Sequence, residues 1–182
     1  MLNIRENAQL ETGGSAWQSE NTQIYNWGHN GSSCSTGGWW AFSGWQHVDG
    51  IDPNAIYTVG GYLYDDVIGG ETMTGGIYAN LEAQFKNASD VVVGTWSSGN
   101  ITGADMTDDA WNAFVAQVKP SNYGLGITKM TFKWEMNNNG GGSGRGIFDD
   151  LMVEQQPIPE PASLILLGVG LVGLFGINKM RK

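Results

Sequence analysis

Residues 55–65 read Ala-Ile-Tyr-Thr-Val-Gly-Gly-Tyr-Leu-Tyr-Asp, and this stretch indicates the fold class of the chain. Neighbouring side chains on an extended backbone point to opposite faces, so the stretch divides into two sets. One set is Tyr57, Val59 and Leu63, and the other is Thr58, Tyr62 and Tyr64. An apolar face beside a polar and aromatic face is typical of a half-buried strand.

Three further stretches alternate in the same way, at residues 76–86, 128–136 and 146–154. Pairs of glycines separate them from their neighbours, as turns do. Residues 106–118 leave two alternatives, a helical turn or two at 106–114 or a strand at 111–118, and the alternation in the second half favours the strand. Trp17, Trp111 and Trp134 are expected in the core. The body is therefore predicted to be all-β.

The charge balance restricts the partners of the body. Residues 1–156 hold 17 acidic and 6 basic side chains, a net of eleven negative charges. Such a surface repels nucleic-acid phosphates and anionic lipid headgroups, so nucleic-acid binding is not expected. Cys34 is the only cysteine, which rules out an intramolecular disulfide. The composition is typical of a secreted binder of neutral glycans or of a calcium-binding protein.

Three motifs of the body resemble one group of domains. They are Asn7-Ala8-Gln9-Leu10-Glu11 with Trp17, then Tyr57-Thr58-Val59-Gly60-Gly61-Tyr62, and finally Ile147-Phe148-Asp149-Asp150-Leu151-Met152-Val153-Glu154. Their order and spacing resemble carbohydrate-binding-module-like, galactose-binding-like jelly rolls. The resemblance implies a two-sheet antiparallel jelly-roll sandwich over residues 1–156.

Such modules often hold a structural calcium ion where the first and last strands meet. Carried over to this sequence, the resemblance implies Glu11 and Asp149 or Asp150 as ligands, because calcium prefers several carboxylate and carbonyl oxygens. The alternative is that Asp149 and Asp150 accept hydrogen bonds from backbone amides near the end of a strand.

The polar faces of two predicted strands are the best candidate for ligand binding. Sugar rings stack on aromatic side chains, while their hydroxyl groups need amide and carboxylate partners. We expect one binding face to contain Tyr62, Tyr64, Tyr78, Asn80, Glu82 and Gln84. Trp39 and Trp40 are further candidates, since adjacent residues on a strand point apart and one of them must be exposed. The alternative is a sheet face that is merely solvated or covered.

Catalysis has little support in the sequence. There is no Gly-x-Ser-x-Gly motif, and His29 and His47 lack the spacing of metal ligands. Glu82 and Glu135 are the pair that a glycoside hydrolase would use if they faced each other at the required separation. The prediction is a non-catalytic protein.

The C-terminal residues have three parts: Pro159-Glu160-Pro161, an uncharged run at 162–177, and a basic end at Lys179, Arg181 and Lys182. As a helix the sixteen-residue run would extend about 24 Å, which allows one thin transmembrane span. The alternative is a buried helix of a soluble domain. The basic end favours the cytoplasmic side and places the body outside the inner membrane.

These parts resemble the PEP-CTERM sorting signal of bacteria that export polysaccharide. The resemblance covers residues 157–182 and implies export, anchoring in the inner membrane at least transiently, and recognition by an exosortase. The first residues do not match a secretory signal peptide, so either the start was assigned too late or the chain is a fragment.

Together these features predict an exported protein of the cell surface or extracellular matrix that binds or organises extracellular polysaccharide. One alternative is a structural or protein-interaction component of the matrix that binds no glycan. The other is a glycan-active hydrolase.

Overall fold

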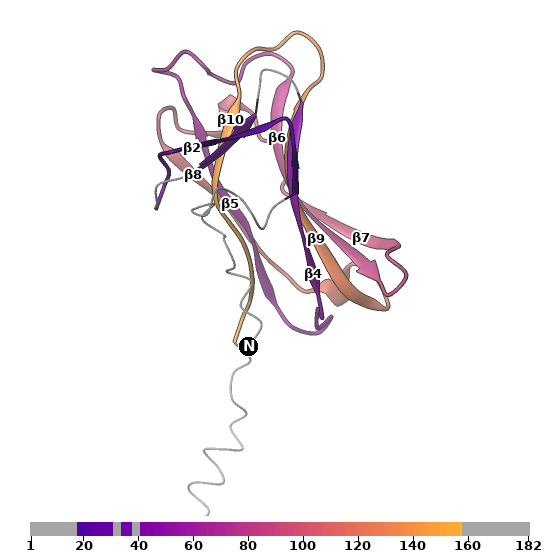
Figure 1. The fold of residues 1–182 in the computed structure, drawn as a ribbon. Coiled ribbons are helices and arrows are strands. Elements are labelled where there is room, and N and C mark those ends of the chain that lie inside the picture. Colours follow the sequence, from indigo (N-terminus) through magenta and orange to yellow (C-terminus); the bar gives the residue numbers. More distant parts are fainter. Residues whose placement is uncertain (1–17, 31–33, 38–40, 158–182) are drawn as a thin grey trace, which may run out of the picture.

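The structure, a computed structural model, describes residues 18–30, 34–37 and 41–157, and these form two antiparallel sheets packed face to face (Figure 1). The β9 sheet has the order β1 (Gln18–Glu20), β4 (Phe42–Asp49), β9 (Ile127–Asn138), β6 (Ile77–Asn87) and β7 (Val92–Ser97). The β10 sheet has the order β2 (Thr22–Tyr25), β3 (Cys34–Gly37), β10 (Gly146–Gln155), β5 (Tyr57–Asp65) and β8 (Trp111–Val118). The predicted all-β sandwich of two antiparallel sheets is confirmed, and its strand order is consistent with a jelly roll.

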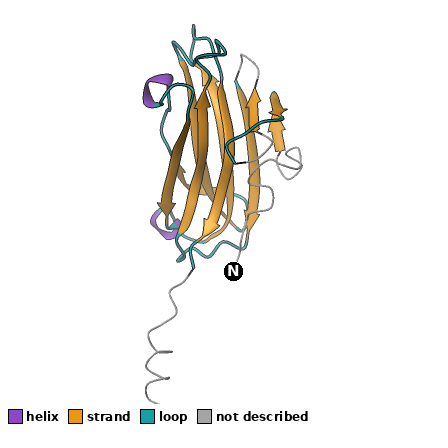
Figure 2. Cartoon of the chain, turned by 90° about the vertical axis from the view of Figure 1, so that its left-hand side faces the viewer, coloured by secondary structure: helices purple, strands orange, loops and turns teal. Residues whose placement is uncertain are grey.

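The four strands predicted from alternation are present, and residues 111–118 form a strand as the sequence favoured. Only two single-turn helices occur in the described part, η1 (Gly103–Asp105) and η2 (Pro120–Asn122), and Figure 2 shows them at opposite ends of the sandwich. No helix among the described residues is long and apolar enough to cross a bilayer. The predicted span at 162–177 lies outside the described residues, as do Glu11, Trp17, Trp39, Trp40 and the Pro159-Glu160-Pro161 sequence.

Three aromatic rings join the two sheets at the centre of the core. Trp134 of β9 lies 4.9 Å, between ring centroids, from Phe148 of β10, and Phe42 of β4 lies 5.6 Å from Trp134 and 6.0 Å from Phe148. Gly44, opposite Trp134 in the β9 sheet, leaves room for the indole, since a Cβ there would lie 2.4 Å from the ring. Tight contact between the sheets therefore depends on one glycine beside the largest core side chain.

Trp134 is buried as expected, whereas the expectation that Trp111 belongs to the core is wrong. Trp111 pairs with Tyr64, whose side chain points outward from the β10 sheet. Because paired residues of neighbouring strands share a face, Trp111 points outward with it.

β5 ends at Asp65, whose carboxyl group lies on the inward face of the sheet and is fully buried. Its Oδ1 accepts a 2.9 Å hydrogen bond from the Met73 backbone N–H, while Oδ2 is buried and has no hydrogen-bond partner among the described residues. Burial raises the pKa of Asp65, and the nearby negative charges of Asp108 and Asp109 raise it further, against the lowering effect of the Met73 N–H.

We expect Asp65→Asn to be more stable than the original chain at pH 7. Between the ordinary and the raised pKa only the folded state holds the proton, so the original chain loses stability as the pH rises through this window. Urea unfolding should show a higher midpoint for Asp65→Asn at pH 7. The difference should shrink as the pH falls towards about 4, the ordinary range of an Asp carboxyl, and stay constant below it.

The matched control is Asp49→Asn, which removes an exposed carboxyl at a strand end and should change stability by less than about 0.5 kcal/mol. A midpoint for Asp65→Asn that is lower at pH 7 and approaches that of the original chain as the pH falls would show that the folded state holds the charged carboxylate better than the neutral one.

Candidate functional site

The outward face of the β9 sheet is lined with polar side chains in register across its strands. One row crosses all five strands and consists of Gln18, Trp45, Lys133, Glu82 and Ser97. The next rows contain Ser43, Glu135 and Asn80 on one side and His47, Thr131, Gln84 and Thr95 on the other. We call this surface the polar face, and Tyr78 of β6 lies at its end opposite Asn137.

Hydrogen bonds between neighbours hold these side chains in place. Gln84 Nε2 donates to Glu82 Oε1 at 2.6 Å, and Ser97 Oγ donates to Asn80 Oδ1 at 3.1 Å. At the β1–β4 edge, Trp45 Nε1 donates to Gln18 Oε1 at 2.5 Å.

Lys133 forms an ion pair with Glu135 along β9. The amide and carboxylate groups of the polar face are therefore oriented before any ligand arrives, which reduces the entropy lost on binding.

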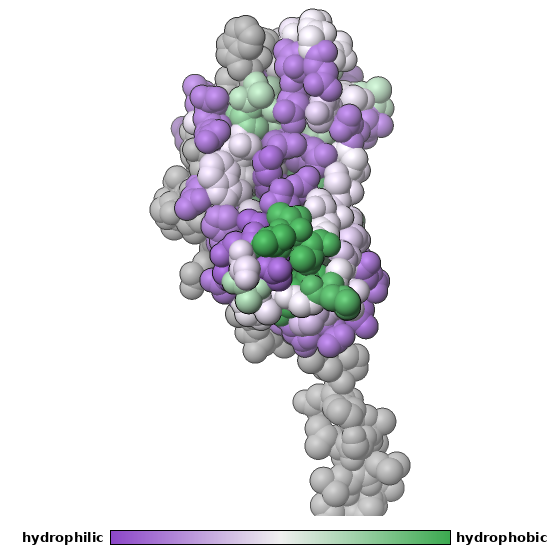
Figure 3. Space-filling view, turned by 90° about the vertical axis from the view of Figure 1, so that its right-hand side faces the viewer, coloured by the Kyte–Doolittle hydropathy of each residue, from purple (hydrophilic) through white to green (hydrophobic). Residues whose placement is uncertain are grey.

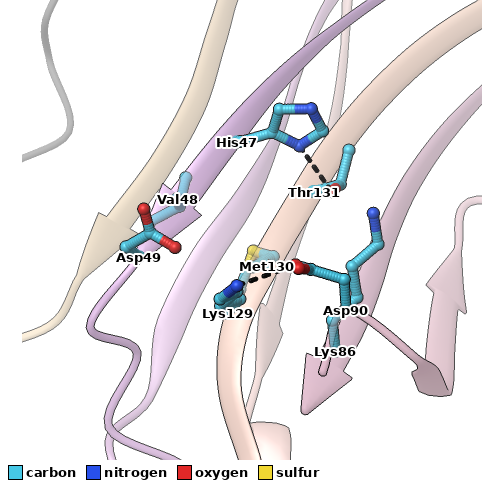
Figure 4. Close-up of a pocket in the computed structure, with 8 residues that line it drawn as sticks. All are labelled: His47, Val48, Asp49, Lys86, Asp90, Lys129, Met130 and Thr131. Carbon is cyan, nitrogen blue, oxygen red and sulfur yellow. Dashed lines mark hydrogen bonds and ion pairs between the residues drawn. The ribbon is translucent and has the colours of Figure 1, made fainter. Parts of the chain in front are cut away.

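A hollow of about 400 Å³ opens at the end of the polar face formed by the last residues of β4 and β6 and the first of β9. Figure 4 shows His47 bound to Thr131 and Lys129 paired with Asp90, with Asp49 and Lys86 on either side. The Nδ1 of His47 lies 2.9 Å from Thr131 Oγ1, and Lys129 Nζ lies 2.8 Å from Asp90 Oδ1. This ion pair holds the pKa of Asp90 below its ordinary value and raises that of Lys129. The hollow is a charged continuation of the polar face.

The outward face of the β10 sheet is covered by a loop that follows β2. The His29 ring stacks on Tyr62 with the ring centroids 4.0 Å apart, and Trp27 makes an edge contact with Tyr64 at 5.6 Å. Trp111 lies within 6.0 Å of both Trp27 and His29. We call these five side chains the aromatic cluster. Tyr62 and Tyr64 are therefore half-buried contacts of a loop and do not form an open platform.

Arg145 extends the covered region towards the start of β10. Its guanidinium lies 5.2 Å from the centroid of the Tyr25 ring and forms a bidentate ion pair with Glu71. Tyr25 in turn stacks on Trp27 with a centroid separation of 6.0 Å. Such a chain of contacts fixes β2 and the following loop against the sheet.

Asp149 and Asp150 of β10 form hydrogen bonds with the same loop. The Oδ2 of Asp149 accepts a 2.6 Å hydrogen bond from the His29 backbone N–H, and Asp149 Oδ1 accepts one from Asp150 N–H at 2.8 Å. The Oδ2 of Asp150 lies 2.7 Å from His29 Nδ1 and 2.6 Å from Asn30 Nδ2. Asp149 thus accepts hydrogen bonds from backbone amides, as in the alternative role, whereas the partners of Asp150 are the side chains of His29 and Asn30.

Among the described residues no group of three or more acidic, His or Cys side chains is arranged to hold a metal ion. Glu11, the third implied ligand, lies outside the described residues. Calcium binding at Asp149 or Asp150 therefore stays a prediction.

The structure does not bring the six predicted ligand-binding residues of two strands onto one face. Tyr62 and Tyr64 belong to β5 in the β10 sheet, whereas Tyr78, Asn80, Glu82 and Gln84 belong to β6 in the β9 sheet. Residues 66–76 carry the chain from one sheet to the other. The polar sides of the two strands consequently point to opposite surfaces of the sandwich.

Several residues of the polar face were missed by sequence reasoning. Lys133, Thr131 and His47 approach the β6 side chains only because β9 lies between β4 and β6. The alternation of Phe42, Gly44 and Val48 was a usable signal for β4 as a half-buried strand, and it placed Trp45 on the outward face.

Glu82 and Glu135 lie on neighbouring strands and point outward from the same sheet. Glu82 pairs with Lys133, and Glu135 pairs with Asn80. A glycoside hydrolase needs its two carboxyl groups on either side of the scissile bond. Two groups that project in parallel from one flat surface do not provide that arrangement by themselves.

Comparison with known proteins separates the tail from the body. Residues 157–182 match the family model described as the PEP-CTERM protein-sorting motif, and no curated protein matches the chain. One similar solved structure is TmCBM61 in complex with β-1,4-galactotriose, with 15% identity, a TM-score of 0.55, and coverage of 86% of this chain and 100% of that one.

Two other similar folds belong to enzymes. A cyclase from Fischerella sp. TAU, in complex with 4-(1H-indol-3-yl)butan-2-one, has 12% identity, a TM-score of 0.58, and coverage of 86% of this chain and 98% of that one. The enzymatically active domain of bacteriophage CBA120 tailspike protein 4 has 11% identity and a TM-score of 0.64 over 85% of this chain, which spans only 21% of the tailspike chain. The chain therefore carries a PEP-CTERM sorting motif at residues 157–182, joined to a β-sandwich whose structural neighbours include carbohydrate-binding modules.

Proposed function

We propose that this protein is an exported, non-catalytic protein of the cell surface or extracellular matrix, and that it binds polysaccharide along the polar face of the β9 sheet. One observation carries the proposal: oriented amide and carboxylate groups lie beside two outward aromatic side chains, Trp45 and Tyr78, and all of these side chains are partly exposed. The opposite face lacks this openness, because the aromatic cluster occupies it.

The spacing of the two aromatic residues fits an extended ligand. Trp45 lies two strands away from β6 and four residues along from Tyr78, so strand geometry separates them by about 16 Å. An indole and a phenol ring can each stack on the apolar side of a pyranose ring. Asn80 and Glu82, and Gln84 just beyond the row of Trp45, can accept from or donate to sugar hydroxyls. The ligand is accordingly a chain of sugars that lies obliquely to the strands.

The charges on the polar face favour a neutral polysaccharide over a strongly charged one. Lys133 is paired with Glu135, and Lys129 with Asp90, so most cations of this face are already neutralised. A sulfated or highly carboxylated chain would meet Glu82 and Glu135 without a surplus of positive charge. Recognition then depends on hydrogen bonds and stacking, which are insensitive to salt.

The sorting motif supports the location. Its apolar segment at 162–177 would anchor the exported chain in the inner membrane, with recognition by an exosortase-type enzyme near Pro159-Glu160-Pro161. Release at this point would deliver the sandwich to the polysaccharide outside the cell.

Substitution of the aromatic residues tests the binding face. We expect Trp45→Ala and Tyr78→Ala each to reduce retention in affinity electrophoresis through gels containing soluble neutral polysaccharides by about 5- to 30-fold, since each loses one stacked aromatic contact. Glu82→Gln should weaken binding less, because the amide keeps one acceptor.

The matched control is Tyr62→Ala, which removes an outward tyrosine from the opposite sheet and should leave retention unchanged. If Tyr62→Ala abolished retention while Trp45→Ala did not, the binding site would be the aromatic cluster. If no polysaccharide retarded the original chain but partner proteins did, the structural alternative would replace this proposal.

Processing of the tail gives a separate prediction. We expect intact-mass measurement of the protein from the surface fraction to show a chain that ends near Pro159-Glu160-Pro161, and the chain in exosortase-deficient cells to retain Lys182. A surface fraction that still ends in Lys182 would contradict cleavage by this route.

A further inference from the structure

We propose that the end of the sandwich at which β10 finishes is a membrane-contact surface that rests on the lipid bilayer before the tail is removed. The proposal rests on the membrane anchoring included in the proposed function. We call this region the tail-exit end. It comprises the loops at 50–56, 88–91 and 119–126, together with the last residues of β10.

The sorting motif is attached at this end and holds it close to the membrane. β10 finishes at Gln155, and the Gln156 backbone N–H donates to the Ile56 carbonyl at 2.8 Å. In Figure 1 the described chain ends at the bottom of the sandwich, where β4 also ends and β9 begins. Only residues 158–161 separate the described body from the apolar segment at 162–177, and four residues extend at most about 14 Å. The tail-exit end therefore stays within a short distance of the bilayer.

Exposed apolar side chains gather at the same end. Leu125 is 89% exposed, Val91 is 56% exposed, and Val92 and Ile56 are each 45% exposed. They are four of the seven large hydrophobic side chains that are exposed in the described part of the chain. Figure 3 shows an apolar patch in the lower half of one side of the molecule, where most other residues are polar.

The contact between loop and strand brings most of these side chains together. Val92 begins β7 beside Lys86, and the backbone of Gly124 lies against Val93, as a Cβ on Gly124 would lie 2.8 Å from the Val93 carbonyl oxygen. Leu125 follows directly. Apolar side chains on loop tips next to lysines are suited to the boundary between headgroups and acyl chains.

Charge distinguishes the two ends of the sandwich. The tail-exit end holds three of the five basic side chains of the described chain, Lys86, Lys119 and Lys129, against Asp49, Asp52, Asp90 and Glu154 nearby. The opposite end carries Asp65, Asp66, Glu71, Asp105, Asp108 and Asp109 with only Arg145. Although the body as a whole repels anionic lipid, the tail-exit end is nearly neutral and is the end that a negative surface repels least.

Two labelled variants of the full chain test the contact. Leu125→Cys and Ile68→Cys place a polarity-sensitive fluorophore at two equally exposed positions, 89% and 88%, on opposite ends of the sandwich. Both are made with Cys34→Ser and reconstituted through the tail into vesicles of phosphatidylcholine with phosphatidylglycerol. We expect a blue-shifted emission at position 125 that spin-labelled lipids quench, and a water-like emission at position 68 that they do not.

A charge variant adds a second measurement. Lys119→Glu reverses an exposed charge in the same loop as Leu125 and should reduce quenching at position 125 in vesicles with phosphatidylglycerol, but not in vesicles of phosphatidylcholine alone.

The outcomes separate this proposal from the one on which it rests. Flotation of the chain with the vesicles reports the anchoring, so water-like emission at both positions in a floating chain overturns only the membrane contact. Failure to float overturns both. A blue shift at position 125 that rises with the protein concentration, without quenching by the lipid, overturns the proposal in favour of contact between two copies of the chain.

Discussion

The packing of Phe42, Trp134 and Phe148 between the sheets determines where every other side chain of the strands can be. Once these rings are buried, alternate residues on β4, β9 and β10 are fixed inward and the remaining ones must point to one of two outer surfaces. The polar face and the aromatic cluster are thus two consequences of one core. Gly44 is part of the same constraint, because its missing Cβ provides the space for the Trp134 indole.

The two outer surfaces differ because only one of them is covered. The loop after β2 brings Trp27 and His29 onto the β10 sheet, where Asp149 and Asp150 accept hydrogen bonds from its amides and its ring. The burial of two carboxylates is offset by these bonds, and the aromatic contacts exclude water from them. The β9 sheet receives no comparable loop from the described residues, so its oriented side chains remain accessible.

The period-two alternation predicted the strand positions and, on β5 and β6, which residues are buried, whereas residues 146–151 of β10 are all buried. Tyr57, Val59 and Leu63 are inward and Tyr62 and Tyr64 outward, as residues 55–65 indicated. Alternation acts within one strand and contains no information about its partners. The placement of β5 and β6 in different sheets depends on pairing with β10 and β9, which are about 90 and 50 residues later in the chain. The same limit applies to Lys133, whose approach to Glu82 is a property of the register alone.

The difference in charge between the two ends of the sandwich connects the two proposals. β9 contains twelve residues, which extend about 40 Å, so the acidic end lies about that far from the tail-exit end. With the tail-exit end against the bilayer, the strands stand away from the membrane and the acidic end is the most distant part of the body. The polar face then lies along the side of this upright sandwich, where a polysaccharide chain can reach Trp45 and Tyr78 without crossing the headgroups. Polysaccharide binding and membrane anchoring use different surfaces of the sandwich, so both can occur at the same time.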